Sequence, residues 1–141
     1  MRFLTIALLG VVLAPSAWSQ PKLSCPASIT VTESAAPAPG WKTSASQTPH
    51  AFERVSVYNG TAGGQEFELA PDTGKDSPAG KIVQTWNLAD YRSMNIFLRC
   101  RYHDTSVTLL ADVPAALKTC TFFFTLTKQN AIVGKSSLLC Q

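Results

Sequence analysis

The chain has 141 residues, 45% of them hydrophobic, and its twelve basic and nine acidic residues give a formal net charge of +3. This length fits one domain of ordinary size. So mild a basic excess argues against binding to nucleic acid or to a strongly anionic surface.

The first nineteen residues predict a secretory signal peptide. A short basic start precedes the apolar run Phe3–Leu13, and the small residues Ala17 and Ser19 stand just before the expected cut. No other apolar run approaches the ~18 residues of a membrane helix, so we do not expect the chain to be embedded in a membrane. We expect removal of Met1–Ser19, a periplasmic location, and a single β domain over Gln20–Gln141.

The first half of the mature chain predicts short strands separated by two long loops. Cys25–Glu33 alternates apolar and polar residues, as a half-buried strand does. Ser34–Thr48 is rich in Ala, Pro and Ser and predicts a loop, whose lone Trp41 is interpreted as a lid over the core, with an exposed binding anchor as the alternative. An Asn-Gly turn then joins two predicted strands, Phe52–Tyr58 and Glu66–Ala70. A second loop, Pro71–Gly80, leads into a further strand, Lys81–Leu88.

The clearest pattern in the chain is Asn95–Tyr102. Its apolar residues alternate with Asn95, Arg99 and Arg101, and Phe97 is the one apolar residue on the polar side. This alternation predicts a strand with one buried face. A polar turn at His103 leads into a second strand and makes a β-hairpin. This second strand is Val107–Ala111, and two further strands are expected at Cys120–Thr127 and Ala131–Cys140.

About eight short strands with turn signals between them predict an all-β fold, either an antiparallel sandwich or an open barrel. Outside the signal peptide, no segment has an apolar period of 3.6 residues long enough to predict a helix. Of the connections, Ser34–Thr48 and Pro71–Gly80 are long for such a fold. Loops of that length often carry function, so they are the first places to expect a partner.

The four cysteines predict two disulfides, because an exported chain meets an oxidising compartment. No pair has C-x-x-C spacing and the two histidines fit no ligand pattern, so neither a metal nor a cofactor is expected. If the residues 128–130 form a turn, Cys120 and Cys140 lie opposite each other across a hairpin. Cys25 is then left to pair with Cys100. This bridge closes a long loop and should stabilise the fold more than the other, by ~4 kcal/mol in total.

No catalytic constellation is evident. His103 and Asp104 are adjacent in a turn, where their side chains splay apart rather than form a triad, and His50 is expected to be solvated. Glu66 and Glu68 lie on one strand face, as a pair of carboxylates of the kind that glycoside hydrolysis uses, but both are expected to face solvent. We therefore predict a protein that is not an enzyme, with an uncharacterised hydrolase as an alternative.

The predicted binding surface is centred on the polar side of Asn95–Tyr102. Arginine is favoured for bidentate pairing with carboxylates and at the centres of interfaces. A pair of charges guarding an edge strand is the competing interpretation. Phe97 and Phe123 lie on otherwise polar faces, and an exposed aromatic residue beside arginine is typical of an interface; cover by a long loop is the alternative for both. The candidate contact residues are Arg92, Arg99, Arg101, Trp41 and Phe97. One of the two long loops is expected to contribute to the same contact surface.

An ordered set of short motifs resembles a family of small exported proteins of Gram-negative bacteria, of unknown function and usually labelled by an enterobacterial locus tag. The resemblance covers nearly the whole mature chain. The motifs that carry it are Cys25-Pro26, Gly40-Trp41, Tyr58-Asn59-Gly60, Leu69-Ala70-Pro71, Trp86-Asn87-Leu88, Cys100-Arg101-Tyr102 and Val113-Pro114. It implies a periplasmic location and two disulfides, and it supplies no catalytic residues. Some members are encoded near type VI secretion genes, which suggests an immunity role.

We therefore predict a periplasmic binding protein that blocks an enzyme attacking the cell envelope. It would be either the immunity protein for a delivered toxin or an inhibitor of a lysozyme-type hydrolase, and its partner would be a protein. The alternative to such a role is an envelope structural or carbohydrate-binding module, which would present an exposed aromatic platform that includes Trp41. The oligomeric state is left open.

Overall fold

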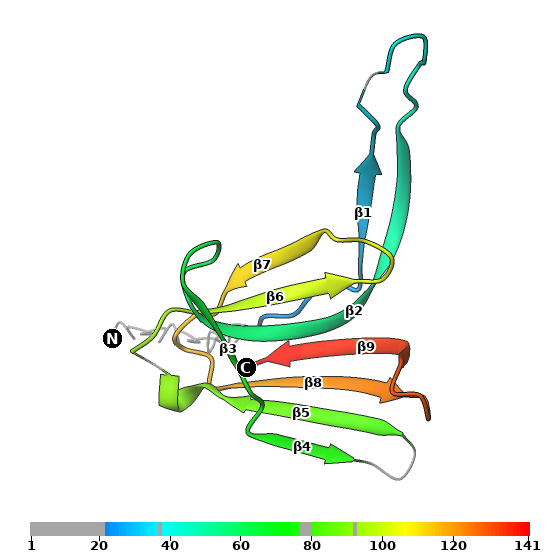
Figure 1. The fold of residues 1–141 in the computed structure, drawn as a ribbon. Helices are drawn as coiled ribbons and strands as arrows, with labels where there is room; N and C mark the ends of the chain where they lie inside the picture. The colour runs from blue at the N-terminus through cyan, green and yellow to red at the C-terminus, as the bar shows by residue number, and fades with distance from the viewer. Residues whose placement is uncertain (1–21, 37, 77–79, 92) are drawn as a thin grey trace, which may run out of the picture.

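The chain is described by a computed structural model over residues 22–36, 38–76, 80–91 and 93–141. These residues form nine strands, arranged in two antiparallel sheets, and one short 3₁₀ helix, η1 (Leu88–Tyr91) (Figure 1). The predicted all-β class is confirmed. The expected signal peptide, Met1–Ser19, lies outside the described residues.

The first sheet is built around one long, strongly curved strand, β2 (Figure 1). The sheet runs β1-β2-β6-β7, and β3 pairs with the last residues of β2. β6 pairs with β2 only from Phe52 onward, so the beginning of β2 has β1 as its one neighbour. The strands of this sheet are β1 (Ser28–Glu33), β2 (Ser46–Gly60), β3 (Glu66–Leu69), β6 (Ile96–Tyr102) and β7 (Thr108–Asp112).

The second sheet packs against the inner face of the first and runs β4-β5-β8-β9, with β9 in contact with β2. Its strands are β4 (Thr73–Asp76), β5 (Lys81–Asn87), β8 (Thr119–Leu126) and β9 (Ile132–Cys140). The buried indole N–H of Trp86 on β5 donates to the carbonyl of Leu69 on β3 at 2.9 Å. This bond ties an edge of the first sheet to the second.

The core lies between the two sheets and follows the predicted alternation. On β6 the buried inward residues are Ile96, Leu98, Cys100 and Tyr102, as expected. The ring of Phe52 stands edge-on to Phe122 of β8 with the ring centroids 5.9 Å apart, in a favoured aromatic geometry. Burying each such side chain stabilises the fold by about 1.5–3 kcal/mol.

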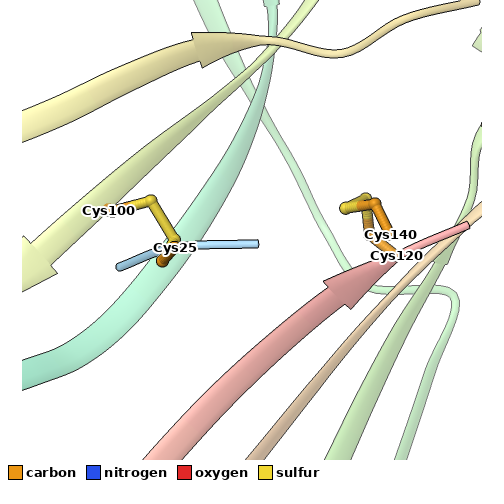
Figure 2. The surroundings of a disulfide bond; sticks show 4 residues. All are labelled: Cys25, Cys100, Cys120 and Cys140. Carbon is orange, nitrogen blue, oxygen red and sulfur yellow. A yellow bond between two sulfur atoms is a disulfide. The ribbon is translucent and has the colours of Figure 1, made fainter. Parts of the chain in front are cut away.

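Both predicted disulfides are confirmed (Figure 2). Cys120 and Cys140 are register partners across the β8–β9 hairpin, so their bridge staples two neighbouring strands. Cys25 precedes β1 and is bonded to Cys100 in the middle of β6, with the Cα atoms 5.9 Å apart. The second bridge therefore fixes the start of the domain to the centre of the first sheet.

Two loop predictions were too long. The residues 46–48, expected in the first loop, belong to β2, because Ser46 pairs with Glu33 of β1 and this pairing outweighs their polar composition. Pro49 is tolerated in that strand because β6 does not yet flank it. The second loop, Pro71–Gly80, contains β4, which pairs with β5 from Thr73 to Asp76. Its residues 77–79 lie outside the described residues.

β1, the beginning of β2 and their connection, residues 28–50, form a hairpin that projects from the body of the protein and is called the arm below (Figure 1). Near its tip, Gly40 adopts a φ of +79° and the amide of Trp41 donates to the carbonyl of Ala38 at 3.0 Å. Trp41 is 80% exposed. The interpretation of Trp41 as a lid over the core is wrong, because the arm carries it away from the body.

Candidate functional site

The outer face of the first sheet, which faces away from the second sheet, is hollowed into a groove of about 580 Å³. We call it the arginine groove, since three arginines line it. It lies over β2, β6 and β7, and turns at its two ends contribute Gly63 and Ser106. Its lining residues are Glu53, Arg54, Gly63, Arg99, Arg101, Tyr102, Thr105, Ser106, Thr108 and Leu110.

A β-bulge directs Arg54 into the groove. Phe52 pairs with Tyr102 and Arg54 pairs with Arg101, so β2 contains one extra residue, Glu53, relative to β6 at this point. Strict alternation would turn Arg54 toward the core beside Phe52. The extra residue restores Val55 to the inner face and leaves Arg54 outside. Bulges commonly serve to re-aim a side chain near a functional site.

The register places two arginines directly opposite each other. Arg54 and Arg101 are Cα partners across the β2–β6 pair, and like charges in that position destabilise a sheet. Glu53 offsets part of the repulsion with a carboxylate 3.6 Å from the Arg54 guanidinium, in a partly exposed pair. Nε of Arg101 is buried with no hydrogen-bond partner among the described residues. The groove is therefore a site of unsatisfied positive charge, suited to a carboxylate or a phosphate.

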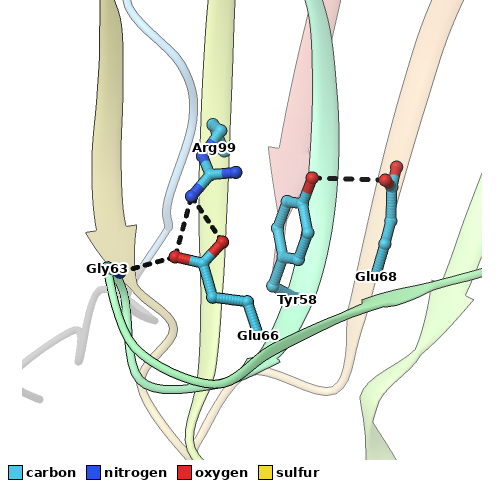
Figure 3. A network of polar contacts seen from close by, with 5 residues as sticks. All are labelled: Tyr58, Gly63, Glu66, Glu68 and Arg99. Atoms are coloured by element: carbon cyan, nitrogen blue, oxygen red, sulfur yellow. Dashed lines mark hydrogen bonds and ion pairs between the residues drawn. The ribbon is translucent and has the colours of Figure 1, made fainter.

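The third arginine, Arg99, is already paired within the protein (Figure 3). Its Nη2 donates to both carboxylate oxygens of Glu66 on β3, at 2.6 and 2.9 Å. Its guanidinium carbon lies 4.7 Å from the centre of the Tyr58 ring, a cation–π contact, and the Tyr58 hydroxyl donates to Glu68 at 3.2 Å. Arg99 thus holds β3 against the sheet and borders the groove rather than offering a free charge.

The Glu66 carboxylate has a lowered pKa. The amide of Gly63 donates to it at 2.6 Å, which is the largest cause, and the bonds from Arg99 add to it. The same contact raises the pKa of Arg99. Glu66 thus stays ionised and does not serve as a general acid, which weighs against the Glu66 and Glu68 pair as catalytic carboxylates.

The lowered pKa predicts a pH dependence of stability. A folded-state pKa below the ordinary value of 4.5 means that the stabilisation by Glu66 is complete above that value and is lost as the pH falls through the folded pKa. Glu66→Gln should therefore lower the melting temperature at neutral pH, and the difference from the wild type should narrow in acid. Thermal unfolding across this range measures it, with Glu33→Gln on the exposed side of β1 as a control. A gap that widens in acid would contradict the assignment.

Phe97 does not belong to the exposed surface. It is 1% exposed, and the expectation of an exposed aromatic beside the arginines is wrong. The cause is its register partner Tyr58, whose ring stacks on that of Phe97 with centroids 5.3 Å apart and planes at 12°. Phe97 supports the platform on which Arg99 rests. Of the other candidates, Arg101 lines the groove, Trp41 lies at the tip of the arm, and Arg92 lies outside the described residues.

The histidines have structural roles. His50, expected to be solvated, is buried in β2 beside His103, the first residue after β6. A carbonyl oxygen only accepts, so Nδ1 of His50 donates to the His103 carbonyl over the 2.7 Å between them. Asp104 takes a φ of 55°, as expected of a turn residue. Within the described ranges, no group of three His, Cys, Asp or Glu residues is placed to hold a metal ion.

A sequence model of the Type VI secretion system Tli immunity protein family matches residues 46–141, from the first residue of β2 to the last of the chain. The chain belongs to this immunity protein family. An uncharacterised 16.3 kDa protein in the trpG 5' region of Azospirillum brasilense is 30% identical over 103 residues, covering 70% of this chain and 69% of that protein. No solved structure matches.

The predicted role of an immunity protein that blocks a delivered toxin is confirmed by this membership, and the partner is a protein. The part of the immunity protein that the structure describes contains no helix long and apolar enough to cross a membrane. The groove lies wholly within the matched residues, whereas β1 and the tip of the arm precede them.

Sequence reasoning missed two charged residues of the groove, Glu53 and Arg54. Their signal was present, because the apolar residues Phe52 and Val55 are three apart and cannot both face inward on a regular strand. That break in alternation indicates a bulge. Leu110 of the strand Val107–Ala111 was missed as well, although it lines the groove.

Proposed function

We propose that this immunity protein is exported and neutralises an envelope-attacking toxin in the periplasm, by binding it through the arginine groove rather than by catalysis. Acidic side chains of the toxin would occupy the groove. The observation that carries the proposal is the opposition of Arg54 and Arg101 across β2 and β6. Like charges kept face to face weaken the free fold, so a role in the bound state accounts for them best.

The surroundings of the groove have the composition of an interface. On β7, Leu110 lines the groove and is exposed, whereas Leu109, opposite Cys100, lies on the other face of the strand. Arginine is enriched where proteins bind one another, and the buried centre of such an interface is more apolar than the rest of the surface. Strand residues are fixed by their ladders, so little ordering entropy opposes binding through them.

The proposed compartment rests on two observations. All four cysteines are buried and joined in two disulfides, which an oxidising compartment such as the periplasm preserves. The apolar run Phe3–Leu13 is the expected export signal. A toxin that this protein meets after export would act on the envelope from the periplasmic side.

Co-expression tests the proposal. Effectors encoded in the type VI gene clusters of the source genome are directed to the periplasm of a laboratory bacterium, with and without the immunity protein. The full chain should restore growth against one of them, called the neutralised toxin below, and a chain lacking Met1–Ser19 should not. The proposal fails if no effector is neutralised, and its compartment is wrong if the chain without those residues protects equally well.

A further inference from the structure

Trp41 is the most exposed large hydrophobic side chain among the described residues, at 80%. Tryptophan is highly buried on average, so an indole held in solvent calls for an explanation. It lies near the tip of the arm, which Figure 1 shows projecting from the body. Nearly all described residues of the arm between Ser28 and Pro49 are exposed, so the body gains little core from it.

The arm is firmly held at its base in spite of this exposure. Cys25, next to its first strand, is bonded to Cys100 in β6. Nδ1 of His50 donates to the His103 carbonyl at 2.7 Å, and the amide of His103 donates to the carbonyl of Ala51 at 3.0 Å. Six register pairs join β1 to β2 above this base. Because the arm is fixed at its base, it loses little conformational entropy when a partner binds its tip.

The chemistry of the tip points to an apolar partner surface. Residues 38–45 are Ala, Pro, Gly, Trp, Lys, Thr, Ser and Ala, with Lys42 as the single charge. A narrow convex tip with one large aromatic side chain fits a concave site, where a fully desolvated indole is a typical hot spot. The other exposed aromatic residues, Phe67 and Phe123, lie on β3 and β8 and share no platform with it.

We propose that the arm is a second toxin-binding element, whose tip inserts Trp41 into an apolar cleft of the toxin. This inference rests on the proposed function and adds an apolar contact at the arm to the charged contact at the arginine groove. The family match begins at residue 46, so β1 and the tip lie outside what the family model describes. The matched body therefore supplies the groove, and the arm supplies selectivity for one toxin.

Two variants test the arm by titration calorimetry with the neutralised toxin. Trp41→Ala removes the anchor alone. The second variant replaces residues 34–45 with Asn-Gly, because Glu33 and Ser46 are register partners and a two-residue turn can close the shortened hairpin. Each variant should raise the Kd for the toxin about thirty-fold while its melting temperature stays unchanged. Phe123→Ala, which removes an exposed aromatic from the second sheet, is the matched control and should bind as the wild type does.

A direct readout is ¹⁹F NMR of the immunity protein labelled with 5-fluorotryptophan, with Trp41→Phe to assign the signal. Addition of the neutralised toxin should shift the Trp41 resonance and remove its sensitivity to solvent isotope, as burial requires. Unchanged resonance and wild-type affinity of both arm variants would overturn the inference. If Arg54→Glu abolishes binding in the same experiments, that outcome leaves the proposed function standing. A failure to find any neutralised toxin overturns both.

Discussion

Replacing Arg54 with glutamate should weaken binding of the neutralised toxin by about thirty-fold or more, without loss of stability. The lining of the groove carries three arginines and one glutamate, and the substitution removes its net positive charge. Truncating an arginine at the centre of an interface costs about 2 kcal/mol, and reversing its charge adds repulsion from acidic groups of the toxin. In the free protein the new carboxylate would face Arg101 across the strands, so the melting temperature should hold or rise.

Calorimetric titration and thermal unfolding of the same preparations measure the two effects. Lys135→Glu, a charge reversal on the second sheet, is the matched control and should leave toxin affinity unchanged. Arg99 is a poor choice for this test because its replacement also breaks the bond to Glu66. The alternative that these arginines guard an edge strand is wrong, because β6 is paired with both β2 and β7. Normal affinity of the Arg54→Glu protein would therefore show that the toxin does not bind through the arginine groove.

Loss of the Cys25–Cys100 bridge should produce the largest fall in stability. The bridge spans 75 residues, against 20 for Cys120–Cys140. The chain-entropy model gives about 4 kcal/mol for the first and about 3 kcal/mol for the second. Since domains of this size have about 5–15 kcal/mol in total, the Cys25→Ala, Cys100→Ala protein should be marginal. Loss of this bridge should also make the base of the arm more mobile.

Urea unfolding of the two double-alanine proteins measures the difference. Alanine is preferable to serine here because all four positions are buried and a hydroxyl would need a partner. The ranking is wrong if the protein without Cys120 and Cys140 proves the less stable of the two. A fall of the predicted size together with weakened toxin binding would be consistent with a rigid arm that matters for recognition.

The fold was predictable where neighbouring residues determine it. The turn at residues 128–130 pairs Leu126 with Ile132 and predicts that Cys120 and Cys140 lie about opposite each other, and the other disulfide followed by elimination. Their direct pairing also needs a register shift in β9 around Gly134, which the sequence did not predict. The alternation of β6 correctly separated its core face from its outer face. The first part of β2 could not be predicted in this way, because its extended state depends on pairing with β1 rather than on its own polar composition.

The site was predictable only in part. Arg101 and Arg99 were placed on the correct face, but the pairing of Arg99 with Glu66 depends on β3 folding beside β2, a contact over 33 residues of sequence. Burial of Phe97 depends in the same way on Tyr58. The opposition of Arg54 and Arg101 requires both the bulge and the strand register, and a single sequence shows neither directly.

Hydrogen exchange of the immunity protein, free and bound to the neutralised toxin, tests most directly whether the arginine groove is the binding surface. Amides in turns exchange readily, so cover by a partner is visible there. The turns at residues 61–65 and 103–107 flank the groove and should exchange more slowly in the complex. Slowing confined to the second sheet around Phe123, with both groove turns exchanging as fast as in the free protein, would contradict the account.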